Sequence, residues 1–153
     1  MAYRPQNKYW SHKVVYKGIT FDSSHERDRY IFLCHQQRQG KISDLQLQKE
    51  FVIIPSTTKL VPTQLKTKVR WDKRVVEQDA RYTCDFFYKE NGKIIVEEYK
   101  SEQTCKLQDY VLRRKLMIQK IYAHNARPNR TPWVFREVIY YFDKEKGTTI
   151  EDK

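Results

Sequence analysis

The apolar pattern begins with a short strand-like segment on each side of Gly18 and then changes to helical spacing. Ser23 precedes Glu26 by three residues, which is the spacing of a capping box at a helix start. The predicted helix runs to Gln39, and Gly40 follows as its C-terminal stop. Glu26 falls on the apolar stripe of this helix and therefore faces inward, unless capping is its whole role.

A strand and an irregular stretch follow the helix. Residues 42–54 alternate loosely between apolar and polar positions and predict a strand that ends at Pro55. Residues 56–80 are too long for a plain loop. They predict a flap, an extra hairpin or a short helix around Trp71–Glu77.

The strongest local signal is a β-hairpin centred on Asn91 and Gly92. The β-rich runs 82–88 and 94–100 flank this Asn-Gly pair, which favours a two-residue turn. With these two residues at the centre of the turn, the residue numbers of any two positions that face each other across the hairpin add to 183. The register decides which side chains meet across the hairpin.

This register brings two carboxylates together. Asp85 faces Glu98, because their numbers add to 183. Side chains alternate along a strand, so Lys100 shares the face of Glu98, whereas Glu97 and Tyr99 point the other way.

The remaining chain predicts one more helix and one more strand. Thr104 can cap a helix over 105–122, and two prolines then precede an aromatic, β-branched strand over 133–142. The charged tail 143–153 is expected to be frayed. The order of helix, strand, hairpin, helix and strand predicts a single α/β domain over 1–153, with one mixed sheet.

Charge is distributed unevenly along the chain. Thirty Lys and Arg stand against nineteen Asp and Glu, which gives a net charge of +11. Three segments together carry +14, and the rest of the chain carries −3: an N-terminal arm over 1–20 and an insertion over 56–81 have +4 each, and 104–130 has +6. Residues 82–103, which contain the hairpin, are acidic at −2. An acidic centre inside a basic chain favours a nucleic-acid partner, although each basic segment alone also fits solvated surface.

The candidate phosphate contacts lie in the second and third basic segments. They are Lys66, Lys68, Arg70, Lys73, Arg74, Lys106, Arg113, Arg114 and Lys115. No apolar run is long enough for a membrane span, and residues 1–20 lack the apolar core of a secretory signal. We therefore expect a cytoplasmic protein without a membrane partner.

The facing carboxylates are the candidate chemistry. Two acids across a β-ladder destabilise each other unless a cation compensates, and Mg²⁺ is commonly held by carboxylates, water and substrate phosphate. Asp85 and Glu98 fit that role, and Lys100 places an ammonium where it can contact the scissile phosphate. Glu26 adds a third carboxylate if it reaches the hairpin. The alternative is an exposed sheet face on which Lys100 makes an ordinary cross-strand ion pair.

These residues resemble a known group of enzymes. Asp85, the segment Glu98-Tyr99-Lys100 and the acid on the first helix are similar to the PD-(D/E)XK nuclease superfamily. Four blocks are more closely similar to a family of small phage-encoded proteins of unknown function placed in that superfamily, whose relatives include Holliday-junction-resolvase-like nucleases. The blocks are GITFDSSHE (18–26), ISDLQLQ (42–48), YTCDF (82–86) and VEEYK (96–100).

The resemblance implies a restriction-endonuclease-like α-β-β-β-α-β core, with a central mixed sheet flanked by helices. It implies that Asp85 and Glu98 bind Mg²⁺ or Mn²⁺, that Lys100 is the catalytic lysine, and that Glu26 assists at the metal. Cys84 departs from the superfamily pattern, in which proline precedes the aspartate. A homodimer and a host-cell cytoplasmic location are also implied by the resemblance, not by the residues.

The function expected on these grounds is a metal-dependent DNA endonuclease of phage type, with branched or recombination intermediates as candidate substrates. Two alternatives stay open. One is a non-catalytic nucleic-acid-binding module that keeps the nuclease fold. The other is a protein-interaction factor, which would bind DNA without a steep salt dependence.

Overall fold

A five-stranded mixed sheet forms the centre of the computed structural model, which describes residues 12–141 and 146–153. Among the first three strands in sheet order each is antiparallel to its neighbour, the third and fourth are parallel, and the last is antiparallel to the fourth. The protein is therefore a mixed α/β fold in which strands predominate. In sheet order the strands are β3 (Ile42–Ile54), β6 (Ala80–Glu90), β7 (Lys93–Ser101), β8 (Trp133–Tyr140) and β9 (Thr148–Asp152).

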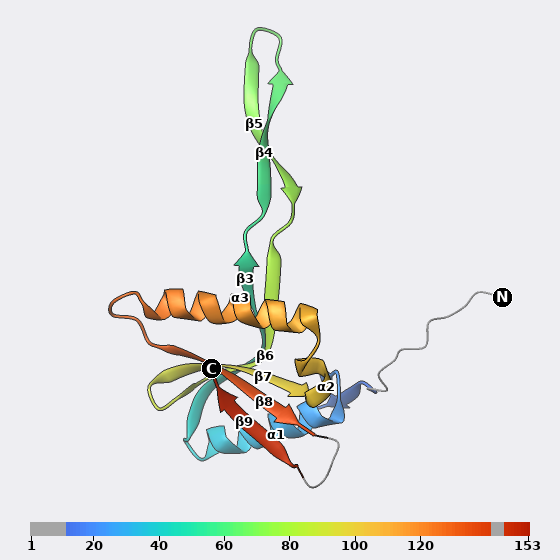
Figure 1. The fold of residues 1–153 in the computed structure, drawn as a ribbon, viewed down its shortest axis with the longest axis vertical. Coiled ribbons are helices and arrows are strands. Elements are labelled where there is room, and N and C mark those ends of the chain that lie inside the picture. The colour runs from blue at the N-terminus through green and yellow to red at the C-terminus, as the bar shows by residue number, and fades with distance from the viewer. Residues whose placement is uncertain (1–11, 142–145) are drawn as a thin grey trace, which may run out of the picture.

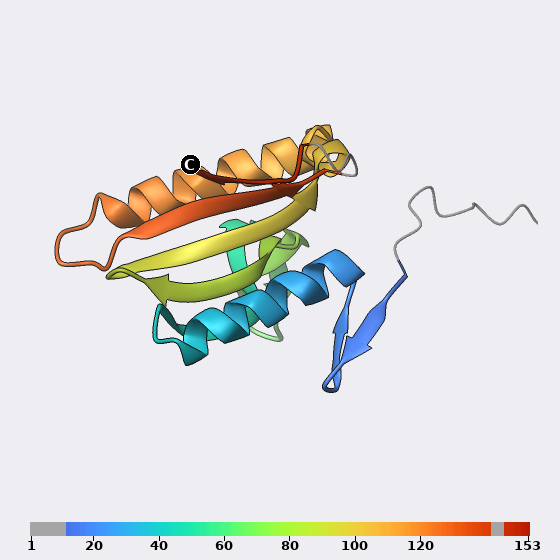
Figure 2. The same cartoon turned by 90° about the horizontal axis from the view of Figure 1, so that it is seen from below.

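Two long helices cover opposite faces of this sheet (Figure 2). They are α1 (Ser24–Arg38) and α3 (Gln108–Asn125), and the short helix α2 (Glu102–Cys105) links β7 to α3. Met117 and Ile121 of α3 pack in one core cluster, and Leu33 of α1 packs in the other. Because β7 lies between both clusters, its apolar residues are buried on both faces.

The start of α1 follows the capping pattern that its sequence predicts. The Ser23 hydroxyl accepts a hydrogen bond from the Glu26 amide at 3.1 Å. The Glu26 carboxylate in turn accepts from the Asp22 amide at 3.0 Å, one residue earlier than in a standard capping box. A small hairpin, β1 (Val14–Tyr16) and β2 (Ile19–Phe21), precedes this cap.

The Asn-Gly hairpin has the predicted register. Asn91 and Gly92 have φ angles of 49° and 74°, the left-handed values that a tight two-residue turn requires. Glu90 pairs with Lys93, and the ladder continues to the pair Phe86 and Glu97. The prediction from local sequence is confirmed here.

The insertion forms a two-stranded arm that projects from the body (Figure 1). It consists of β4 (Thr57–Gln64) and β5 (Val69–Glu77), so the hairpin alternative is confirmed and the short helix around Trp71–Glu77 is wrong. The arm continues the pairing of β3 with β6, because Ile54 pairs with Ala80 and Thr57 pairs with Glu77. This long ladder outweighs any local helical tendency.

The helix predicted over 105–122 with Thr104 as its cap is wrong at its start. Ser101 caps α2 instead, since its hydroxyl accepts from the Thr104 amide at 3.2 Å. The chain then breaks at Leu107 before α3 begins. Thr104 loses the capping role because Ser101 lies at the end of β7, where the strand must turn.

The prediction of a frayed tail is also wrong for residues 148–152, which form β9 on the edge of β8. The Arg136 guanidinium contacts Asp152 at 2.7 and 3.1 Å, and the Lys153 amine binds buried Glu137. These long-range pairs are invisible in the local pattern. The rest of the predicted arm and tail, residues 1–11 and 142–145, lies outside the described residues.

Across residues 12–141 and 146–153, none of the helices combines the length and apolar character needed to cross a bilayer.

A buried ion pair joins α1 to the sheet. Arg29 contacts both carboxylate oxygens of Glu97, at 2.7 and 2.8 Å, and Glu97 is completely buried. The Tyr88 hydroxyl donates to the same carboxylate at 2.6 Å. Removing one partner of such a pair leaves an uncompensated buried charge, which is strongly destabilising.

We expect Arg29→Met to lower the free energy of unfolding by about 3 kcal/mol, because the buried Glu97 carboxylate would lose the cation that compensates it. Urea denaturation followed by circular dichroism measures this loss. Arg27→Met is the matched control, since Arg27 lies on the same helix and, among the described residues, forms its ion pair with its exposed neighbour Asp28. Equal losses in the two variants would mean that the buried Arg29–Glu97 pair stabilises the fold no more than an exposed ion pair does.

Candidate active site

The acidic centre begins where the ladder between β6 and β7 stops. The last recorded pair is Phe86 with Glu97, and the next position would pair Asp85 with Glu98. There the Asp85 carboxylate accepts a hydrogen bond from the Tyr99 backbone amide at 2.8 Å. The Asp85 side chain accepts this hydrogen bond instead of a backbone carbonyl, and the bond holds Asp85 in place against β7.

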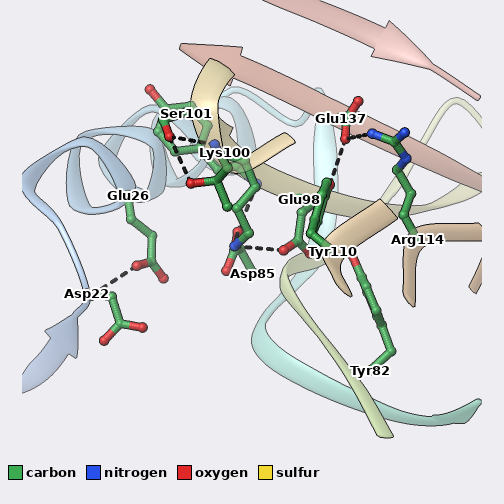
Figure 3. A network of polar contacts seen from close by, with 12 residues as sticks. Asp22, Glu26, Tyr82, Asp85, Glu98, Lys100, Ser101, Tyr110, Arg114 and Glu137 are labelled. Atoms are coloured by element: carbon green, nitrogen blue, oxygen red, sulfur yellow. Dashed lines mark hydrogen bonds and ion pairs between the residues drawn. The ribbon is translucent and has the colours of Figure 1, made fainter. Parts of the chain in front are cut away.

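Lys100 joins the two predicted carboxylates (Figure 3). Its Nζ lies 3.2 Å from Asp85 Oδ2 and 2.7 Å from Glu98 Oε1. The Tyr82 hydroxyl donates to the other Glu98 oxygen at 2.5 Å. Glu98 is only 3% exposed, so the alternative of an open sheet face is wrong. The predicted convergence of Asp85, Glu98 and Lys100 is present.

A pocket of about 560 Å³ opens beside this cluster, between the start of α1 and the end of β7. Glu26 lies on the α1 wall, and Asp85 and Lys100 lie on the sheet wall (Figure 3). Glu26 therefore both caps the helix and faces the pocket, so the two roles predicted for it coexist. The other lining residues are His12, Val14, Asp22, Ser23, Ser24, His25, Tyr99, Ser101, Gln103, Thr104 and Tyr140.

Burial and crowding of negative charge perturb the acids. The pKa of Glu26 is raised to about 7, first by burial and then by Asp85, against the opposing effects of the Asp22 amide and Lys100. The pKa of Glu98 is also raised to about 7, first by burial and then by Asp85. Both groups therefore exchange protons near neutral pH.

The lysine responds in the opposite direction. Burial lowers the pKa of Lys100, but Asp85 and Glu98 outweigh burial, so the net pKa lies above that of an ordinary lysine. Lys100 consequently remains an ammonium at neutral pH. One cation thus serves two adjacent carboxylates, with Glu26 as a third acid across the pocket.

The donor set fits a hard divalent cation. Asp85, Glu98 and Glu26 offer only carboxylate oxygens, and Lys100 marks the place between two of them where positive charge is stabilised. Within the two described ranges, no group of three His, Cys, Asp or Glu side chains is close enough to form a ready metal site. An ion would therefore rest on one or two protein carboxylates, as Mg²⁺ commonly does.

The predicted phosphate contacts lie in two places. Lys66 and Lys68 lie at the tip of the arm, Lys73 and Arg74 are exposed on β5, and Arg70 pairs with its neighbour Asp72.

The remaining four lie along α2 and α3. Arg113 and Lys115 are exposed, and Lys106 pairs with Glu102 at 2.9 Å. Arg114 instead neutralises Glu137 at 2.8 Å. Arg114 therefore supports the packing of α3 on β8, and it is not an open site for a phosphate.

Sequence reasoning missed the residues that hold the centre in position. Tyr82 belongs to the β-rich run 82–88, and its hydroxyl bond to Glu98 depends on the fold. Ser101 and Thr104 share a hydroxyl contact at 2.9 Å on the pocket wall. The signal that could have found Ser101 is its position directly after the Glu-x-Lys segment.

Glu26 makes stability depend on pH. Its folded pKa of about 7 lies above the ordinary 4.5, so the folded state binds the proton more tightly than the unfolded state. The contribution of Glu26 to stability is therefore fully present below pH 4.5 and is lost as pH rises through 7. Substitution by glutamine, which keeps the cap acceptor and cannot ionise, should raise the unfolding free energy at pH 8 by about 1 kcal/mol in metal-free buffer.

Urea titrations of wild type and Glu26→Gln at pH 5 and pH 8 measure this effect, and the two proteins should agree at pH 5. Glu102→Gln is the control, because Lys106 lowers the pKa of Glu102 and no gain is expected. A loss of stability in Glu26→Gln at both pH values would contradict the interpretation and leave capping as the dominant role.

Comparison with known proteins identifies a family but no activity. Residues 6–141 match the family described as "Protein of unknown function (DUF1064)". No curated protein matches the chain. The matched segment contains both walls of the pocket and the whole arm, and it covers most of the 153 residues. The chain therefore belongs to the DUF1064 family.

Proposed function

We propose that this protein is a divalent-metal-dependent DNA endonuclease that hydrolyses phosphodiester bonds. The observation that carries the proposal is the joint contact of the Lys100 ammonium with Asp85 and Glu98 at a pocket lined by Glu26. Carboxylates for a metal and an amine for a phosphate are what this reaction requires.

Asp85 and Glu98 would hold Mg²⁺ or Mn²⁺, with Glu26 assisting from the opposite wall. The ion, when bound, supplies positive charge against the phosphate and lowers the pKa of water. The chain's contribution is to fix the two acids, and it does so through the Tyr99 amide and the Tyr82 hydroxyl.

Two side chains have further roles in the proposal. Lys100 keeps its charge at neutral pH, so its ammonium can neutralise a phosphate oxygen as charge develops there. Glu26 has a pKa of about 7, which suits a group that accepts a proton from an attacking water and releases it again. Each role requires the side chain to be at the pocket, where the structure places both.

The order of the elements supports the proposal. The helix α1, the three antiparallel strands β3, β6 and β7, the helix α3 and the parallel strand β8 follow one another along the chain. This is the α-β-β-β-α-β order expected for a PD-(D/E)XK nuclease. The net charge of +11 supports a polyanionic substrate, for which branched or recombination DNA is the candidate.

A non-catalytic nucleic-acid-binding module is the second candidate. It is favoured by the absence of a ready three-ligand metal group among residues 12–141 and 146–153. Lys100 already neutralises the two carboxylates in this arrangement. DNA cleavage separates the two candidates, because a binding module would not depend on Asp85.

We expect Asp85→Asn to abolish cleavage, since it removes one charged metal ligand, while DNA binding stays equal or becomes tighter through reduced repulsion. The assay uses four-way junction, flap, linear duplex and single-stranded DNA with Mn²⁺. Asp44→Asn is the matched control, because Asp44 is exposed and its ion pair within the described part of the chain is with Lys89. Identical behaviour of wild type and Asp85→Asn on every substrate would end the enzyme proposal.

Lys100→Met should lose turnover by at least a hundredfold while Mn²⁺ affinity is retained or increased. The reason is that the ammonium competes with an added cation for Asp85 and Glu98. Free Mn²⁺ measured by electron paramagnetic resonance gives the affinity, and single-turnover cleavage gives the rate. A parallel loss of metal binding would instead show that Lys100 holds the two acids in place.

A further inference from the structure

The arm formed by β4 and β5 carries an apolar face that no other element of the described residues covers. Cross-strand pairing puts Leu60, Pro62, Val69, Trp71 and Val75 on the same side of this ribbon. Trp71 is 63% exposed, and Leu60 is 60% exposed. A two-stranded ribbon has no core of its own, so an exposed apolar face of this kind indicates a binding surface.

Basic residues gather on the other face and the tip of the arm, and Lys73 stands beside Leu60 on the apolar face. Over 57–77 the chain has six basic and two acidic residues. Arg70 is paired with Asp72 at 2.8 Å. The other five cations form no ion pair within the described part of the chain: Lys59, Lys66, Lys68, Lys73 and Arg74.

The positive charge of the arm indicates which kind of partner binds this surface. A second copy would bring another arm of the same positive charge, and five apolar side chains fall short of the ~800 Å² per partner that a stable interface buries. Lysine is also depleted at protein interfaces. A polyanion satisfies the unpaired cations, and the thymine methyl groups exposed at base edges in the major groove offer apolar contacts to Trp71 and its neighbours.

The dimensions agree with duplex DNA. Two paired strands form a ribbon narrow enough for a major groove, which is about 12 Å wide. The eight residues of β4 extend the arm by about 26 Å, which corresponds to roughly eight base pairs. The arm can therefore contact DNA well beyond the segment that lies over the pocket.

We propose that the β4–β5 arm is a ribbon that enters a groove of duplex DNA, with Trp71 and the apolar face against the bases and the unpaired cations against the phosphates. The inference shares the DNA partner with the proposed function but does not depend on cleavage. It places substrate recognition on an element separate from the acidic pocket.

Binding without cleavage tests the arm. Fluorescence anisotropy in EDTA measures the dissociation constant for a labelled duplex of about 30 base pairs, long enough to pass the arm, and for one of about 10 base pairs. Trp71→Ala should weaken binding to the long duplex about tenfold with an unchanged salt slope, because the lost contact is apolar. The short duplex should bind both proteins equally.

The double variant Lys66→Gln/Lys68→Gln should reduce the slope of log K against log salt by about two, since each phosphate contact contributes about 0.9. Two controls are matched in chemistry. Leu112→Ala removes an equally exposed apolar residue from α3, and Lys41→Gln/Lys93→Gln removes two exposed lysines beside the Asn-Gly turn. Both controls should leave the long-duplex affinity and its salt slope unchanged.

Unchanged affinity and salt slope in the arm variants would overturn the proposal. A change from dimer to monomer in Trp71→Ala, measured by sedimentation, would also overturn it by assigning the apolar face to a second copy. The proposed nuclease activity fails by a different result, the absence of cleavage with metal. Circular dichroism verifies that each variant is folded.

Discussion

Neutralising the carboxylates buried in the central sheet is the constraint on which the structure depends. Glu97 and Glu98 on β7 and Glu137 on β8 are almost or completely buried, and each needs a cation because an isolated buried charge is very costly. Arg29 pairs with Glu97 across both oxygens, and Glu137 receives Tyr110, Arg114 and Lys153. These two clusters are closed, and they tie α1, α3 and the C-terminal strand to the same two central strands.

Glu98, the third buried glutamate, does not have a cation of its own among the residues that the structure describes. Glu98 shares Lys100 with Asp85, and Glu26 faces them across the pocket, so a single ammonium serves up to three acids. The pKa values of Glu26 and Glu98 are raised first by burial and then by the neighbouring charge of Asp85. A structural ion pair would carry matched charge, as Glu97 does. A pocket in which the acids outnumber the cation instead favours the binding of a further cation. This supports the proposal that the site binds a metal ion.

Acidic and basic residues also lie in different parts of the molecule. The acids lie inside the body, whereas a large share of the unpaired basic residues lies on the arm that β3 and β6 extend outward (Figure 1). Such a division suits a polyanion, which can be held by the basic surface while one phosphate is presented to the acidic pocket. The same long hairpin that carries Asp85 thus also builds the surface proposed to bind DNA.

Local sequence determined the features that depend on neighbouring residues. The Asn-Gly turn and the two-residue period of a strand are sufficient to predict that Asp85 faces Glu98 beside Lys100, and Ser23 with Glu26 is sufficient to start α1. Only the tertiary structure decided that Glu26 reaches the pocket, that Tyr82 bonds to Glu98, and that residues 148–152 join the sheet. Turn and cap geometries are set within a few residues, whereas these contacts join segments distant in the chain and exist only after the layers have packed.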